Sequence, residues 1–394
     1  MDQEMNIGID EARTAGLDPD RLLRVRQAVE TDTGKGLYDG AVYAVGRHGK
    51  IVLLEAVGHT DLASGRAAAT DDVFVIMSLT KTFTAGAVFS FIERGELALT
   101  TRIAEVIPEF GIKGKHRLTV AHLLTHTGGM SVDLPPMLPM EQVGDLKAYV
   151  AAACHDPLKS HPGTRVSYSP LTAHAVLAEV VRRLDGGSRP FRRILDEVLF
   201  QPLKMKDTSL GIRKDLEPRK VPVVVRDKTP GLFDPMMMEA MNLLIREDTE
   251  IPAGGAVSTA FDLFRWAEML RNHGELDGVR ILSPAILKLA TNNHTGNMSN
   301  DIFDHAREIH GWDPYPAYLG LSFFLRGEGI FPMPFGQIAS PGTFGGLGAG
   351  STMFWVDPER DLTFILLTAG LLEEGASFIR HQRLSDLVIG AVVD

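Results

Sequence analysis

The sequence lacks the features that mark several large classes of protein. Its one cysteine, Cys154, cannot form an internal disulfide, so the fold does not depend on an oxidising compartment. No apolar stretch reaches the roughly 18 residues that a membrane-spanning helix needs. Residues 1–6 (MDQEMN) lack the basic and apolar regions of a secretory signal. We therefore expect a cytoplasmic protein without a membrane span.

Basic clusters and nucleotide-binding loops are missing as well. The formal net charge is −10 and no group of lysines and arginines is suited to phosphate, so nucleic acid is not an expected partner. No Walker-type or dinucleotide glycine-rich loop occurs. No Gly-x-Ser-x-Gly sequence is present either, which argues against the nucleophile elbow of an α/β-hydrolase.

A metal site is the next function that the sequence disfavours. His122 and His126 have helical i, i+4 spacing, but a zincin motif needs a glutamate directly after the first histidine, and Leu123 stands there. We expect these histidines to serve helix packing and a C-terminal cap that closes at Gly128-Gly129. No metal and no cofactor is predicted.

Length and patterning indicate a two-part organisation. The 394 residues exceed what a single hydrophobic core usually holds, while 44% hydrophobic and 23% charged residues are ordinary for a globular protein. Strand-like runs lie near both ends and helical patches lie between them. We therefore expect an α/β domain built from residues 1–110 and 250–394. Residues 111–249 would form a mainly helical domain that contributes the pocket rim.

Local patterns predict most of the elements. A hairpin is expected from two β-rich runs around a glycine turn, and a second one from two C-terminal runs around Asp357–Arg360. The proline-rich segment Val132–Met140 cannot be regular helix, and Lys228–Glu250 is expected to be a loop. Helices are expected at Pro19–Thr31, Thr80–Glu93, Val120–Thr125, Leu146–Ala153, Leu171–Arg183 and Ala376–Val392; strands are expected at Ala41–Val45, Ile51–Leu54, Tyr318–Leu325, Ser351–Val356 and Leu362–Thr368.

The most informative stretch is Ser78-Leu79-Thr80-Lys81, at the start of a mostly apolar helical segment. Residues three apart share a helix face, so the Ser78 hydroxyl and the Lys81 amine can meet. An alcohol needs a neighbouring base to act as a nucleophile, and burial can make a lysine amine that base. Alone, the pattern also fits an N-cap serine with a solvated lysine.

Two further motifs follow in order. Tyr168-Ser169-Pro170 comes ninety residues after Ser78, and Phe344-Gly345-Gly346-Leu347 precedes the last strands. The three motifs together resemble those of class C β-lactamase-like serine hydrolases, and most of all those of family VIII carboxylesterases. Two more stretches resemble this group, and the likeness runs from about residue 20 to 390. These stretches are His122–Gly129 and Pro252–Thr259 leading into Asp262-Leu263.

The resemblance implies a fold and a set of roles. The fold would be that of β-lactamases and penicillin-binding proteins: an antiparallel sheet flanked by N- and C-terminal helices, with an inserted helical domain. Ser78 would be acylated, and Lys81 and Tyr168 would share the general-base role. We expect a phenol beside an ammonium to have a lowered pKa. Which of the two groups takes the proton stays open.

The backbone N–H groups of Ser78 and Leu347 would form the oxyanion hole. Gly345 and Gly346 would allow the backbone to approach the substrate. Phe344 and Met137 are weaker binding candidates, because methionine adapts to irregular apolar shapes. The residues around Met236–Met241 would also lie at the rim. For the glycines, the alternative interpretation is a β-bulge.

Departures from the motifs indicate the substrate. Pro170 stands where this family usually has an asparagine, and Phe344 stands where a β-lactamase has a lysine. The site would thus lack an amide group and a cation for anionic β-lactams and peptides. We therefore expect an EC 3.1.1-type serine esterase or lactonase that acts on a small, neutral, hydrophobic ester.

Several alternatives remain open. An acyltransferase could use the same acyl-enzyme, and an amidase or a weak β-lactamase is less expected. A binding protein that keeps the fold without catalysis would have to retain Ser78, Lys81 and Tyr168 unused. A homo-oligomer is also left open.

Overall fold

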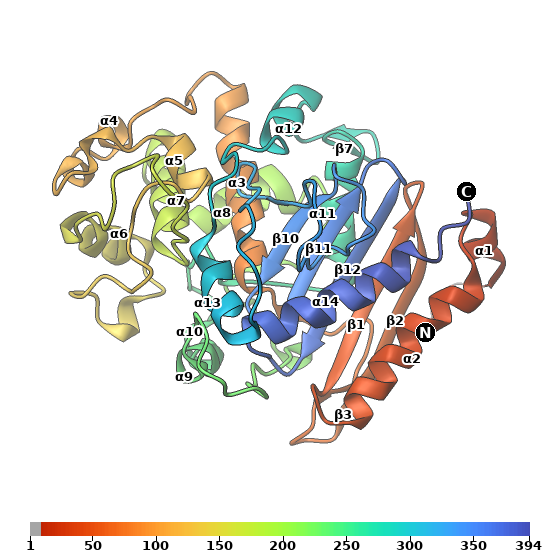
Figure 1. Cartoon of the computed structure of the whole chain (residues 1–394). Helices are drawn as coiled ribbons and strands as arrows, with labels where there is room; N and C mark the ends of the chain where they lie inside the picture. The colour runs from red at the N-terminus through yellow and green to blue at the C-terminus, as the bar shows by residue number, and fades with distance from the viewer. Residues whose placement is uncertain (1–8) are drawn as a thin grey trace.

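The computed structural model describes residues 9–394. Residues 1–6, for which the absence of a secretory signal was predicted, lie outside the described part. The chain is built around a seven-stranded antiparallel sheet in the order β3-β2-β1-β12-β11-β10-β9 (Figure 1). Its strands are β1 (Gly40–Arg47), β2 (Lys50–Asp61), β3 (Arg66–Ala67), β9 (Phe324–Leu325), β10 (Phe344–Gly348), β11 (Thr352–Asp357) and β12 (Leu362–Ala369).

The centre of this sheet joins the two ends of the chain. Strand β1 pairs with β12 from Gly40↔Ala369 to Arg47↔Leu362, and every residue of both strands is buried. Successive side chains of a strand point to opposite faces. Accordingly, Val42 belongs to one hydrophobic core and Tyr43 to the other. The antiparallel sheet predicted from the sequence is confirmed.

Helices cover both faces. Helices α2 (Pro19–Gly34) and α14 (Glu374–Ile389) lie against one face, and α11 (Ala260–Arg271) lies behind the other (Figure 1). Helix α2 begins where Asp18 caps it, since the carboxylate accepts the N–H groups of Asp20 and Arg21. The predicted N- and C-terminal helices are thus confirmed.

The helical part lies beside the sheet, where α3 (Thr80–Glu93) packs against α7 (Thr172–Leu184) (Figure 1). A three-stranded sheet, β4-β6-β5, connects this part to the rest, with β4 (Phe74–Val75), β5 (Ser209–Leu210) and β6 (Ala256–Ser258). The segment 111–249 therefore contributes a strand to a sheet shared with the other segments. The domain boundary itself stays a prediction.

The remaining elements are short or lie at the periphery. They are α1 (Ile9–Thr14), α4 (Ile103–Val106), α5 (Val120–Leu124), α6 (Leu146–His155), α8 (Phe191–Leu195), α9 (Pro235–Glu239), α10 (Met241–Leu244), β7 (Glu275–Leu276), β8 (Val279–Arg280), α12 (Pro284–Ala290), α13 (Asp301–His310), the 3-10 turns η1 (Met77–Leu79), η2 (Pro108–Gly111), η3 (Lys115–Arg117), η4 (Met140–Gln142) and η6 (Glu217–Arg219), and the π-helical turn η5 (Asp196–Phe200).

Two local predictions were wrong. The expected loop Lys228–Glu250 contains α9 and α10, because Asp234 caps a helix that starts at Pro235. The expected strand Tyr318–Leu325 is a strand only at its last two residues. Tyr318 and Ser322 have positive φ angles of 43° and 65°, which interrupt an extended backbone.

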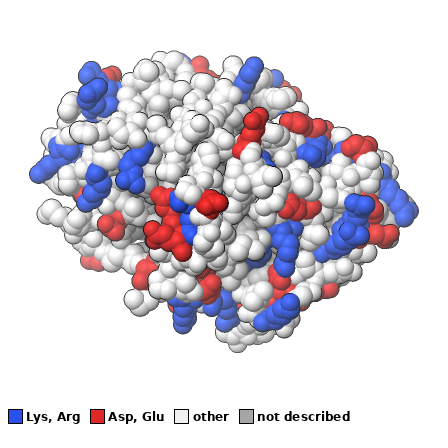
Figure 2. Space-filling model, in the orientation of Figure 1, with Lys and Arg blue, Asp and Glu red and all other residues white. Residues whose placement is uncertain are grey.

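The visible surface mixes both signs of charge. Figure 2 shows lysines and arginines interspersed with aspartates and glutamates, without a continuous basic face in this view. Among residues 9–394, no helix combines the length and the apolar character required to cross a bilayer. The described part of the chain also holds no group of three or more metal-ligating side chains.

The close approach of β10 and β11 yields a stability prediction. A Cβ on Gly345 would lie 2.0 Å from the Phe354 carbonyl oxygen of the neighbouring strand. Gly345→Ala should therefore destabilise the protein by about 2 kcal/mol, because the strands must move apart. Urea unfolding measures the loss. Gly342→Ala is the matched control, since its Cβ would meet its nearest atom only at 4.0 Å; equal stability of the two variants would contradict this packing.

Candidate active site

Three predicted side chains meet at one point. Ser78 Oγ lies 2.9 Å from Lys81 Nζ and also 2.9 Å from the Tyr168 hydroxyl. Ser78 is in the 3-10 turn η1, Lys81 is in the first turn of α3, and Tyr168 comes shortly before α7. The chain thus brings together an alcohol, an amine and a phenol from segments ninety residues apart.

The backbone before Ser78 is held in an unusual conformation. Met77 has a φ of 50°, a left-handed value that is rare for a side chain of this size. Hydrogen bonds fix both flanking carbonyls: Thr80 Oγ1 donates to Met77 O at 2.7 Å, and Thr352 Oγ1 donates to Ile76 O at 2.9 Å. Such strain persists only where surrounding contacts over-determine it. Here those contacts fix the position of Ser78.

Lys81 has a second partner, the Ala253 carbonyl oxygen, at 2.8 Å. Two threonines of α3 hold the segment around Ala253. Thr84 Oγ1 donates to Pro252 O at 2.7 Å, and the Ala256 N–H donates to Thr80 Oγ1 at 3.1 Å. The amine of Lys81 is therefore fixed between the nucleophile candidate and a backbone carbonyl whose position is set on both sides.

Burial determines the protonation states. Lys81 and Tyr168 are each 4% exposed, and Lys81 contacts no carboxylate among the described residues. Desolvation disfavours charge, so it lowers the pKa of Lys81 well below its usual value and raises the pKa of Tyr168. The expected lowering of the Tyr168 pKa by a neighbouring ammonium was wrong, because burial of the phenol is the dominant cause and raises that pKa.

His126 packs behind Tyr168, with ring centres 4.5 Å apart. Its Nδ1 accepts the Ser169 N–H at 3.3 Å, and burial, followed by the nearby Lys81, lowers its pKa to about 3. His122 instead accepts the Thr119 N–H at the start of α5. His126 lies beyond the end of that helix with a φ of 54°, so the two histidines do not form the i, i+4 pair that their spacing indicated.

Two narrow cavities open on Ser78 and Tyr168. One of about 40 Å³ has mostly apolar walls and also one carboxylate, Glu374. That carboxylate accepts the N–H groups of Leu232 and Phe233, and burial raises its pKa. The other cavity lies between Ser78, Lys81 and His126. The walls of the first cavity include Phe233, Phe324, Leu347, Gly348, Ala349, Gly350, Ser377, Phe378 and His381.

Only some of the predicted binding residues line the two cavities next to Ser78. Leu347 lines both cavities. Gly346 lines the second one, but its missing side chain makes room for Leu79, since a Cβ would lie 2.8 Å from that side chain. Gly345 makes room for β11 in the same way. Packing therefore gives both glycines a structural reason, and backbone approach to the substrate stays a prediction.

Phe344 and Met137 lie outside the walls next to Ser78. Phe344 is 6% exposed and packs edge-on against Phe323, which does line the second cavity. Met137 is 78% exposed on the surface. From the other methionine-rich segment, Met238 borders a cavity that shares Phe233 and Gly350 with the first one.

Sequence reasoning missed Ala253, Glu374 and the phenylalanines of the wall. The Pro252–Thr259 stretch was noted as a family feature, but nothing in it singles out a carbonyl as a partner for an amine. Glu374 begins α14, where an acidic residue is ordinary helix chemistry. Its place beside Ser78 depends on how α14 crosses the sheet, which local sequence does not encode.

Comparisons with known proteins identify the family and the fold. The protein-family model described as "Beta-lactamase" matches residues 25–387. Penicillin-binding protein 4 of Amycolatopsis lactamdurans is 30% identical over 71% of this chain and 73% of its own length. Esterase EstB of Burkholderia gladioli is 31% identical over 64% of this chain and 68% of its own. A solved family VIII carboxylesterase superposes with a TM-score of 0.78 at 20% identity, covering 95% of this chain and 99% of that one.

The neutral amine of Lys81 predicts a pH-dependent stability effect. The unfolded chain binds a proton on Lys81 below pH 10.5, whereas the folded protein does not until the pH falls below the depressed pKa. The loss of folding stability caused by burying Lys81 is thus greatest below that depressed pKa, and it vanishes above about pH 10.5. Lys81→Met should raise Tm at pH 7 and lose that gain towards pH 10. Thermal unfolding across this range tests it.

Lys50→Met on the exposed edge of β2 is the matched control, and its effect should not depend on pH in this range. A Lys81→Met gain that grows with pH would show that the amine is charged in the folded protein.

Proposed function

Because this chain belongs to the Beta-lactamase family, we propose that it is a serine hydrolase that cleaves a neutral, hydrophobic carboxylic ester or lactone through an acyl-Ser78 intermediate. The single observation that carries the proposal is the position of Ser78 Oγ, 2.9 Å from a buried amine and 2.9 Å from a buried phenol. These are the groups that an alcohol needs in order to lose a proton and attack a carbonyl.

Acylation begins with Lys81 as the base. Its neutral amine accepts the Ser78 proton while Ser78 Oγ attacks the ester carbonyl carbon. The ammonium that forms donates to the Ala253 carbonyl oxygen, already 2.8 Å away. The N–H groups of Ser78 and Leu347 are the proposed donors for the oxyanion, since Leu347 borders both cavities next to Ser78.

Tyr168 then acts as the acid. Its hydroxyl keeps its proton in the resting site and donates it to the leaving alkoxide as the tetrahedral intermediate collapses. The resulting phenolate is balanced by the Lys81 ammonium, whose nitrogen lies 5.0 Å from the ring centre. Water, activated by the same pair with the roles reversed, hydrolyses the acyl-enzyme.

The substrate preference follows from the wall beside Ser78. Phe233, Phe324 and Phe378 give it an apolar surface, and the Glu374 carboxylate repels an anionic substrate. Among residues 9–394, no arginine lines either cavity next to Ser78, and the lysine there is Lys81 itself. Pro170 and Phe344 remove the amide and the cation that the family uses for anionic β-lactams and peptides. A neutral ester with a short acyl chain fits best.

The same acyl-enzyme could pass its acyl group to an alcohol or amine, so the acyltransferase alternative is tested by adding acceptors and following the product ratio. Cleavage of lactones, the cytoplasmic location and a homo-oligomer stay predictions.

Removing the nucleophile and the acid should have different effects. With p-nitrophenyl butyrate, Ser78→Ala should abolish turnover and show no butyryl adduct by intact mass spectrometry. Tyr168→Phe should lower turnover roughly 100-fold or more, because hydrolysis of the acyl-enzyme loses the phenol that helps to activate water. It should still form the adduct of Ser78 with this good leaving group.

Tyr149→Phe is the matched control, since that buried phenol bonds to Thr172 rather than to Ser78. Full activity of Ser78→Ala would rule out the acyl-serine mechanism. A stoichiometric burst without further turnover would indicate a covalent trap instead of an enzyme.

A charge-matched pair of substrates tests the role of Glu374. The anionic p-nitrophenyl hemisuccinate should have a kcat/KM about tenfold or more below that of p-nitrophenyl butyrate, because its carboxylate meets Glu374 in a desolvated site. Glu374→Gln should narrow this gap, although its single amide oxygen can replace only one of the two carboxylate oxygens that accept the Leu232 and Phe233 N–H groups. An unchanged ratio in Glu374→Gln would exclude Glu374 as the source of the preference.

A further inference from the structure

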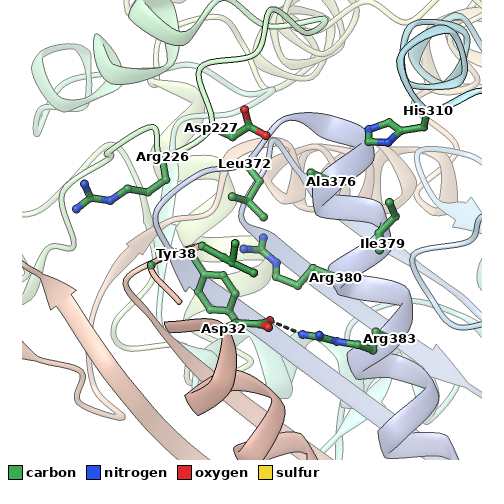
Figure 3. Close-up of a pocket in the computed structure, with 12 residues that line it drawn as sticks. Asp32, Tyr38, Arg226, Asp227, His310, Leu372, Ala376, Ile379, Arg380 and Arg383 are labelled. Carbon is green, nitrogen blue, oxygen red and sulfur yellow. Dashed lines mark hydrogen bonds and ion pairs between the residues drawn. The ribbon is translucent and has the colours of Figure 1, made fainter. Parts of the chain in front are cut away.

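A second, larger cavity lies between the end of α2 and helix α14 (Figure 3). Its volume is about 450 Å³, within the range of roughly 300–1,000 Å³ that is typical of small-molecule sites. It shares no lining residue with the two cavities that open on Ser78. It is therefore a separate site, on which the proposed hydrolytic mechanism does not depend.

Arg380 is the unusual residue of this cavity. The side chain is 5% exposed, and only its Nη2 is bonded, to the Gly350 carbonyl oxygen at 2.9 Å and more weakly to Ser377. Nε and Nη1 have no hydrogen-bond partner among the described residues. The Tyr38 ring covers the guanidinium at 4.7 Å, and the Tyr38 hydroxyl lies beside the Asp32 carboxylate.

The other arginines at this cavity are already paired. Arg226 binds Asp39 through Nε and Nη2 at 2.7 and 2.9 Å and points away from Arg380 in Figure 3. Arg383 forms an ion pair with Asp32. Arg380 has no carboxylate partner in the described part of the chain. Burial lowers its pKa to about 10, which still leaves it charged at neutral pH.

The unpartnered groups define what a ligand must offer. The unpaired groups are three of the five guanidinium N–H bonds of Arg380, and all three are hydrogen-bond donors. Leaving a buried donor unpaired costs about 1–3 kcal/mol, and more for a charged group. A ligand that supplies acceptor oxygens and a negative charge would remove this cost, provided that small side-chain movements uncover the buried nitrogens.

The rest of the wall narrows the class of ligand. Leu37 and Ile379 line the cavity and are each about half exposed, and Leu372 lies next to Arg380. These side chains favour an alkyl group. Asp32 and Asp227 also line the cavity and disfavour a dianion such as phosphate.

We propose that this cavity is a second ligand site that binds a small monocarboxylate with an alkyl chain, its carboxylate on Arg380 and its chain on Leu37 and Ile379. A carboxylate presents acceptors only, carries one charge and pairs well with guanidinium. The chemistry is that of a free carboxylic acid, the class of product that ester hydrolysis releases.

Isothermal titration calorimetry of the full chain with octanoate tests the proposal. Octanoate should bind with measurable heat, butyrate more weakly, and inorganic phosphate and octylamine not at all. Arg380→Gln should weaken octanoate binding roughly tenfold or more, since a charge-assisted hydrogen bond is lost. Because none of these probes is an ester, the result does not depend on turnover at Ser78.

A second pair of variants, at Ile379, tests the proposal even if Arg380→Gln does not fold. Ile379 is 51% exposed, so substitutions there leave the core intact. Ile379→Glu should weaken octanoate binding at least fourfold more than the neutral, similarly sized Ile379→Gln. The absence of binding, binding that neither Arg380→Gln nor Ile379→Glu changes, or tighter binding of phosphate than of octanoate would overturn the proposal.

Discussion

The structure depends on the burial of one amine without a counter-charge. Lys81 is enclosed by the core around α3 and contacts the Ser78 hydroxyl and a backbone carbonyl, but no carboxylate of residues 9–394. An ammonium in such a place is costly, so burial lowers the pKa of Lys81 and favours the neutral amine. Burial likewise raises the pKa of the Tyr168 phenol and favours its protonated form. The base and the acid of the proposed mechanism are therefore assigned from desolvation, in contrast to an arrangement with a buried ion pair.

Maintaining that arrangement requires segments far apart in the sequence. The strained residue Met77 sets the direction of Ser78, and Thr80 and Thr84 of α3 fix the segment that holds Ala253. The short sheet β4-β6-β5 brings the chain before Ser78 alongside the chain after Ala253. The large sheet supports both, because Thr352 of β11 binds the Ile76 carbonyl. A small number of threonine hydroxyls thus connects the helical part to the sheet at the site.

Much of this was predictable from the sequence, for physical reasons. The helices of both ends and the paired strands follow from hydrophobic periodicity, and the juxtaposition of Ser78 and Lys81 follows from helix geometry. Tyr168 could be added because its motif resembles that of a known family. What failed depended on three-dimensional context. The pKa of Tyr168 depends on whether Lys81 is charged, and the role of Gly345 depends on the distance to Phe354 in the next strand. The exposed position of Met137 is likewise a property of the folded surface.

Helix α14 shows most clearly what a sequence pattern leaves undecided. Ser377 and His381, four residues apart, line the cavity at Ser78, whereas Ala376 and Arg380, also four apart, line the second cavity. Each pair forms a stripe along one side of the helix, because residues at i and i+4 share a face. In the sequence both stripes read as one buried surface, and neighbouring Arg380 and His381 give no sign that they face different spaces. The helix therefore separates a cavity with a carboxylate from a cavity with an unpaired cation, and the two sites can differ in charge preference although consecutive residues build them.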